Sequence, residues 1–176
     1  MMTFYGLRQG RLVRLDHASA SGLPASADVL WIDLFDPSRE DERAVETLLG
    51  LAVPTRQEMA EIEESARLYE DSGSLVMTAV VINGAAEGRP SRAQVTFVLT
   101  PTHLVSVRYA DPVPFRTFEA KCQRQPEAHT SGDRILVSLL LVHFFNHQTH
   151  HRGQVHCMLT QAGGQPDATD LPQMPE

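Results

Sequence analysis

Two neighbouring β-strands are predicted in the stretch Gln94–Tyr109, which reads QVTFVLTPTHLVSVRY. Valine recurs in both runs, and phenylalanine and threonine join it in the first, as is typical of a pleated and half-buried surface. Pro101 and Thr102 lie between the two runs and leave room only for a tight connection, so the two strands are expected to pair antiparallel. This stretch therefore predicts an antiparallel strand pair.

The flanking sequence predicts more strands and several helices. Turn residues and apolar patterning predict further strands at Thr3–Leu7, Arg11–Asp16, Val29–Leu34, Arg67–Glu70 and Leu75–Ile82. Capping residues predict helices that begin at Asp36-Pro37, Thr55, Asp111-Pro112 and Ser131. The first helix is expected to end at Gly50, and the last is expected to be long and to run to Gln161. The fold class is therefore α/β or α+β, with a mixed sheet that is largely antiparallel.

The core of the sheet is predicted from the apolar positions of these strands. It comprises Trp31, Ile32, Leu34, Val76, Met77, Val80, Val95, Phe97, Leu99, Leu104 and Val107.

Composition excludes several classes of protein. The 176 residues are 42% hydrophobic and 21% charged, which is ordinary for a soluble globular domain. The net charge of −7 argues against a nucleic-acid partner, and two cysteines suggest a reducing cytoplasm and no disulfide framework. The longest apolar run, Ile135–Phe145, is shorter than the roughly 18 residues that span a bilayer, so no membrane span is expected.

Acidic residues are concentrated in the middle of the chain. Twelve carboxylates and four arginines lie between Asp33 and Asp71. Carboxylates are suitable ligands for Mg²⁺ or Ca²⁺, but runs of charge more often form a solvated face with helix-start charges. We favour the solvated face and keep the cation site as the alternative.

A histidine cluster is the second candidate. His143, His147, His150 and His151 share one face of the predicted last helix. His147 and His151 stand one turn apart and can chelate a transition metal, while a surface stripe or a packed helix interface remains the alternative. No nucleophile or phosphate-loop motif is present, so the sequence does not predict an enzyme.

Five stretches together resemble the cytoplasmic N-terminal domain of CorA-type divalent-cation transporters, including the zinc-transporting branch. They are Trp31–Pro37 (WIDLFDP), Glu61–Glu70 (EIEESARLYE), Leu75–Ala79 (LVMTA), Val95–Arg108 (VTFVLTPTHLVSVR) and Gly132–Leu136 (GDRIL). The resemblance implies a mixed sheet sandwiched by helices, a cytoplasmic location, a pentameric homo-oligomer, and Mg²⁺ or Co²⁺ as weakly bound ion. The Gly-Met-Asn signature of the family's ion pathway does not occur, so no ion conduction is expected of this chain.

From about residue 141 the sequence resembles a different family. Phe144–Val155 (FFNHQTHHRGQV), Leu159–Gly163 (LTQAG) and Thr169–Leu171 (TDL) are similar to the last helix and tail of DinB-like metal-binding proteins. That resemblance implies that His147 and His151 are two ligands of a divalent metal such as Zn²⁺ or Ni²⁺. The chain is thus divided into a CorA-like domain, residues 1–140, and a DinB-like fragment with a loose tail, residues 141–176.

Three functions follow from these patterns. The first is a truncated CorA-like cytoplasmic domain that regulates or assembles without conducting ions. The second is a DinB-like metal protein, such as a metal-dependent hydrolase or thiol transferase. The third is an inactive fusion remnant. The family's regulatory acid has no counterpart after Ile82, where the chain reads Asn83-Gly84-Ala85-Ala86, so no regulatory site is carried over.

Overall fold

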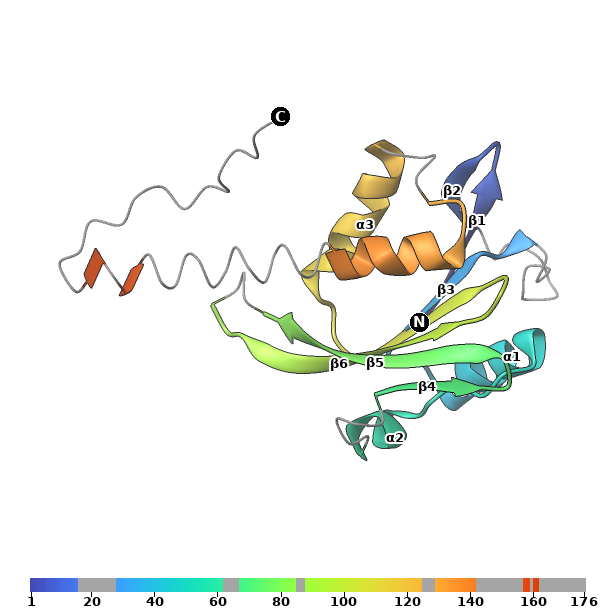
Figure 1. Cartoon of the computed structure of the whole chain (residues 1–176), viewed down its shortest axis with the longest axis horizontal. Coiled ribbons are helices and arrows are strands. Elements are labelled where there is room, and N and C mark those ends of the chain that lie inside the picture. The colour runs from blue at the N-terminus through green and yellow to red at the C-terminus, as the bar shows by residue number, and fades with distance from the viewer. Residues whose placement is uncertain are drawn as a thin grey trace.

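The computed structural model describes residues 1–15, 28–61, 67–84, 88–124 and 129–141, together with residues 157, 158, 160 and 161. A seven-stranded sheet in the order β2-β1-β3-β7-β6-β5-β4 forms its centre (Figure 1). The strands are β1 (Met2–Arg8), β2 (Arg11–Leu15), β3 (Trp31–Phe35), β4 (Leu68–Asp71), β5 (Ser74–Asn83), β6 (Ser91–Leu99) and β7 (Leu104–Arg108). β3 and β7 pair in parallel, and the other five neighbouring pairs are antiparallel. The predicted mixed, largely antiparallel sheet is confirmed.

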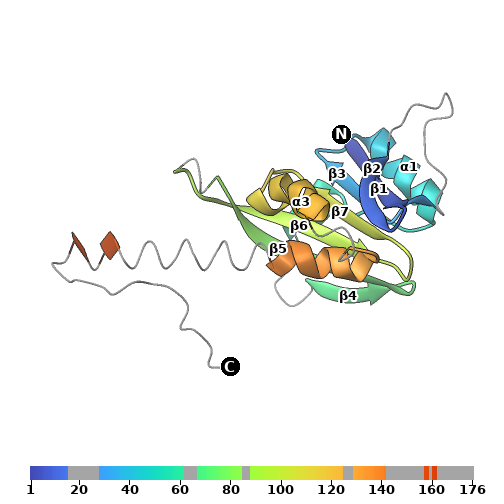
Figure 2. The ribbon, with the colours of Figure 1, turned by 90° about the horizontal axis from the view of Figure 1, so that it is seen from above.

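Helices cover both faces of this sheet. α1 (Arg39–Leu49) and α2 (Arg56–Glu61) lie on one face, and α3 (Val113–Arg124) lies on the other with a helix over residues 132–141, drawn in orange (Figures 1 and 2). Each face has its own cluster of buried side chains: Val45 and Met59 belong to the first, and Phe118 and Ile135 to the second. The arrangement is a sheet sandwiched between helices, as expected.

β3 and β7 lie in the middle of the sheet and are buried along most of their length, because helices cover both faces of the sheet. In β3, Trp31 packs toward α3, while Ile32 and Leu34 pack toward α1. Of the eleven predicted core residues, Met77, Leu99 and Val80 are half-buried and the remaining eight are buried. The predicted register and core are therefore confirmed.

The start of α1 differs from the prediction. The helix begins two residues later than expected, with Ser38 as its N-cap in place of Asp36. Ser38 Oγ accepts the backbone N–H of Asp41 (3.2 Å), and the Asp41 carboxylate accepts the backbone N–H of Ser38 (3.0 Å). Asp36 has a φ of 44°, outside the extended range that an N-cap normally adopts. The end of α1 is as predicted, at a left-handed Gly50.

Replacing Ser38 by alanine is expected to destabilise the domain by about 1 kcal/mol, because an N–H group at the start of α1 loses its acceptor. Urea unfolding measures the change. Asp36→Gly is the matched variant, and it should leave stability unchanged or slightly raised, since glycine adopts a positive φ without strain. A larger loss of stability in Asp36→Gly than in Ser38→Ala would show that Asp36 is the true cap.

A capping box also opens α2, as the sequence predicts. Glu58 Oε2 accepts the backbone N–H of Thr55 (2.8 Å), and Thr55 Oγ1 accepts the backbone N–H of Glu58 (3.3 Å). These hydrogen bonds hold the pKa of Glu58 below its ordinary value. The box therefore stabilises the fold at neutral pH, and its contribution is lost as the pH falls and the carboxylate is protonated.

The last predicted helix is only partly described. It starts directly after Ser131, whose carbonyl oxygen accepts the backbone N–H of Ile135 (3.1 Å), as an N-cap carbonyl does. The helix is described to residue 141, and residues 157, 158, 160 and 161 are also helical. Residues 142–156 lie outside the described residues, so the single long helix to Gln161 stays a prediction. Within the described part of the chain, no helix is long and apolar enough to cross a bilayer.

Candidate functional site

The predicted metal ligands lie outside the part of the chain that the structure describes. His147 and His151 both fall there, together with His143 and His150. Their grouping on one helix face therefore stays a prediction. In the described ranges themselves, no three His, Cys, Asp or Glu residues are placed to hold one metal ion.

Several acids of the central segment have partners within the fold. Asp41 and Glu58 complete the two capping boxes. Glu42 is buried, pairs with Arg39 (3.1 Å), and lies next to the capping region of α1. Glu46 Oε1 accepts the backbone N–H of Val53 (3.0 Å). These contacts support the interpretation of the acidic stretch as helix-start charges and surface.

Asp33 belongs to a buried network that joins β3 to β7. The parallel register places Asp33 opposite Ser106 and puts Arg108 two residues further along the same face. The Ser106 hydroxyl donates to Asp33 Oδ1 (2.7 Å) and accepts from Trp31 Nε1 (3.0 Å). The Arg108 guanidinium donates to both Asp33 oxygens, with Nη2–Oδ2 at 2.9 Å and Nε–Oδ1 at 3.1 Å. All four side chains are buried, and their polar atoms satisfy one another.

Arg108 continues this network toward α3. Its guanidinium lies between two aromatic rings, 4.4 Å from the centroid of Phe35 and 4.5 Å from that of Phe115. Nη1 donates to the carbonyl oxygen of Ala110 (2.9 Å) and to Asp111 Oδ1 (2.8 Å), just before α3 begins. Arg108 thus connects the ends of two strands to the start of a helix. A carboxylate with this many donors is not available to a metal ion, so Asp33 is not a cation ligand.

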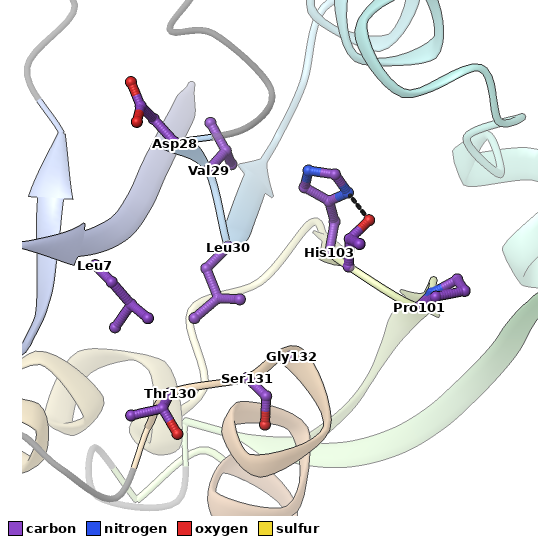
Figure 3. A pocket seen from close by; sticks show the side chains of 10 residues that line it. Leu7, Asp28, Val29, Leu30, Pro101, His103, Thr130, Ser131 and Gly132 are labelled. Atoms are coloured by element: carbon purple, nitrogen blue, oxygen red, sulfur yellow. Dashed lines mark hydrogen bonds between the residues drawn. The ribbon is translucent and has the colours of Figure 1, made fainter. Parts of the chain in front are cut away.

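A pocket of about 610 Å³ lies where the β6–β7 turn meets the helix over residues 132–141. Its walls are Leu7, Asp28–Leu30, Pro101–His103 and Thr130–Gly132 (Figure 3). A Cβ atom on Gly132 would lie 3.2 Å from the carbonyl carbon of His103, so glycine lets the helix begin close against the turn. Sequence patterns did not predict this pocket, because it forms between segments about 100 residues apart.

The polar side chains of the β6–β7 turn that line this pocket form hydrogen bonds within the turn itself. Thr102 Oγ1 and His103 Nδ1 lie 2.8 Å apart, and such a hydroxyl–imidazole pair is also what an activated nucleophile needs. The two residues are chain neighbours, and Thr100 Oγ1 accepts the backbone N–H groups of both, at 3.2 and 2.8 Å. Asp28, the carboxylate among the lining residues, forms an ion pair with Arg8 (3.4 Å). We therefore assign the pair to the turn and not to catalysis.

Sequence comparison finds relatives among magnesium transport proteins. The chain is 32% identical to a magnesium transport protein CorA from Wolinella succinogenes over 143 residues, which cover 77% of this chain and 44% of that protein. Over most of its length this chain is similar in sequence to CorA proteins. The CorA-like chain spans less than half the length of the curated relatives that it matches.

Solved structures show the same fold. The soluble domain of CorA from Methanocaldococcus jannaschii matches with a TM-score of 0.55 at 14% identity, covering 92% of this chain and 65% of the other. The full-length CmaX protein matches with a TM-score of 0.64, also at 14% identity, covering 97% of this chain and 54% of the other. The CorA-like sheet and its helices are thus an architecture that this chain shares with these proteins.

The C-terminal part of the CorA-like chain matches a second family. Residues 119–176 match the DinB family. This confirms the second resemblance seen in the sequence. The matched range begins within α3, before residue 141, and the division of the chain at residue 140 stays a prediction.

Proposed function

We propose that this chain is the cytoplasmic domain of a CorA-like divalent-cation transport protein, and that it regulates or assembles that protein without conducting ions itself. The observation that carries the proposal is the 32% identity to a magnesium transport protein across 77% of the chain. The sandwiched sheet supports it, because the soluble domain of a CorA has the same fold. On this proposal the chain is not an enzyme, and it binds Mg²⁺ or Co²⁺ only weakly.

Self-association is the direct test of an assembly role. A domain that assembles a transporter should form homo-oligomers, since most soluble oligomers consist of identical subunits in closed symmetry. Sedimentation velocity over a wide range of protein concentrations, with and without Mg²⁺, measures this. We expect oligomers whose population rises with concentration. A monomer at every concentration would contradict the assembly role.

Growth of cells that lack their own magnesium uptake systems tests the absence of conduction. The chain is not expected to restore growth at low magnesium, because its longest apolar run is shorter than a bilayer span. Membrane fractionation of the same cells shows where the chain resides. Restored growth with the chain in the membrane fraction would refute the proposal.

A second function is favoured by the DinB match over residues 119–176. His147 and His151 would bind Zn²⁺ or Ni²⁺ through their imidazole nitrogens if the segment that contains them is one helix. With two protein ligands and water, the affinity should be weak. Binding should fail below a pH of about 6.5, because imidazoles must be neutral to coordinate a metal.

Isothermal titration with Zn²⁺ tests this second function. Replacing both His147 and His151 by alanine should abolish the binding heat. The control is His156→Ala, which removes a nearby histidine that is not one of the two proposed ligands, and it should retain the binding heat. Titration with Mg²⁺ separates an imidazole site from an oxygen site, since imidazole ligands favour Zn²⁺. Identical isotherms for the wild type and the double variant would show that the two histidines are only a polar helix face.

A further inference from the structure

A small pocket on the α2 side of the sheet gathers positive charge. It has a volume of about 240 Å³ and lies between α2, the first residues of β6 and the segment after β7. Its polar lining consists of Arg56 from α2, Ser91, Arg92 and Gln94 from β6, and Tyr109. None of these lining residues is an aspartate or a glutamate.

Arg56 and Arg92 reach this pocket from two different elements. Among the residues that the structure describes, neither forms an ion pair with a carboxylate. Other arginines of the fold do have such partners, as Arg39 does with Glu42 and Arg108 with Asp33. Two arginines therefore line one pocket whose lining contains no acidic residue, so an anion there would meet net positive charge.

Tyr109 holds one of the two guanidinium groups in place. The guanidinium carbon of Arg56 lies 5.1 Å from the centroid of the Tyr109 ring, within the range of a cation–π contact. The Tyr109 hydroxyl donates to Glu42 Oε1 (3.4 Å), which fixes the ring from its far end. Burial and the neighbouring Glu42 carboxylate raise the pKa of Tyr109, so the phenol stays protonated and adds no negative charge.

We infer that this pocket binds a small phosphoryl anion between Arg56 and Arg92. Guanidinium groups present forked N–H donors that match phosphate oxygens, and the Gln94 amide adds a further donor. The volume is smaller than the roughly 300–1,000 Å³ of pockets that enclose a whole drug-sized ligand. The pocket therefore fits a phosphate or diphosphate group, with any organic remainder outside. This site is independent of the proposed CorA-like role and of the histidine pair.

Isothermal titration of the full chain with inorganic pyrophosphate, at constant ionic strength, tests the site. Saturable binding is expected for the wild type. Arg56→Gln and Arg92→Gln should each weaken it roughly tenfold, equivalent to about 1.4 kcal/mol. Arg43→Gln is the matched control: it removes the same charge from an exposed position on α1 that does not line the pocket. All three arginines are exposed, so the variants should fold, and urea unfolding checks this.

Several outcomes are decisive. Loss of affinity in the two pocket variants, with the Arg43→Gln control unaffected, supports the site. An equal loss in all three variants would show a general effect of charge and would overturn it, as would the absence of saturable binding to the wild type. Titration with adenosine diphosphate then identifies the source of the anion. Equal affinity for both probes indicates a diphosphate carried by a nucleotide, whereas binding of pyrophosphate alone indicates a free anion.

Discussion

Replacing Arg108 by methionine is expected to destabilise the domain by about 3–5 kcal/mol, because breaking a buried ion pair leaves an uncompensated charge in the core. Methionine retains the apolar volume between Phe35 and Phe115 but leaves the Asp33 carboxylate buried without its cation. The remaining donor to Asp33, the Ser106 hydroxyl, cannot neutralise a full negative charge. Urea unfolding of the wild type and the variant measures the change in the free energy of unfolding.

Two further variants separate the buried pair from its exposed neighbour. Asp33→Asn combined with Arg108→Met removes both charges and should recover most of the loss, because no unpaired charge stays buried. Asp111→Ala removes the half-exposed partner of the same guanidinium and should cost about 1 kcal/mol or less. If Arg108→Met cost no more than Asp111→Ala, the network would not be important for the stability of the fold.

The strands could be predicted from the sequence because local and global requirements agree there. The run from Gln94 to Tyr109 is apolar, β-branched and interrupted by a proline, and each of these features favours two paired strands. The structure places both strands where expected, with Phe97 and Leu104 in the core. A near-continuous apolar run was enough to predict these strands, since both faces of the sheet are buried.

The start of α1 was predicted less accurately, because two neighbouring residue pairs could each cap the helix. Asp36 followed by Pro37 fits the usual pattern of a cap and first helical residue. Ser38 with Asp41 fits an equally good pattern, and the box between them satisfies two N–H groups where Asp36 alone would satisfy one. The choice depends on the backbone of Asp36, which turns to a positive φ as the chain leaves β3.

The buried network was missed, although the sequence contains a signal for it. Asp33 lies in the apolar run WIDLF, and Arg108 ends the apolar run LVSVR. Charged residues inside buried strands need a partner, so each could have been assigned to the other. The pairing depends on β3 and β7 being parallel neighbours, a contact between segments 75 residues apart that no local pattern encodes. The pocket with Arg56 and Arg92 depends on long-range contacts in the same way.

Phe97→Ala is the second substitution with a large expected effect, about 3–5 kcal/mol of lost stability. The Phe97 side chain is 2% exposed, and its ring stacks on Phe115 with centroids 6.2 Å apart. Truncation would leave a cavity between β6 and α3 that the rigid sheet cannot fill. Thermal and urea unfolding measure the loss. Near-ultraviolet circular dichroism shows whether the aromatic packing around Trp31 is also disturbed.

Leu68→Ala is the matched control for this cavity. Leu68 lies on the edge strand β4 and is 60% exposed, so its truncation should change stability by about 0.5 kcal/mol or less. The contrast between the two positions tests whether Phe97 is part of the buried core while Leu68 lies on an exposed edge. Equal losses at Phe97 and Leu68 would show that α3 does not pack on β6 as the structure places it. A large loss at Phe97 alone is the result expected from the structure, in which residues of β6 alternate between the two layers and Phe97 faces α3 while Val98 faces the α1–α2 layer.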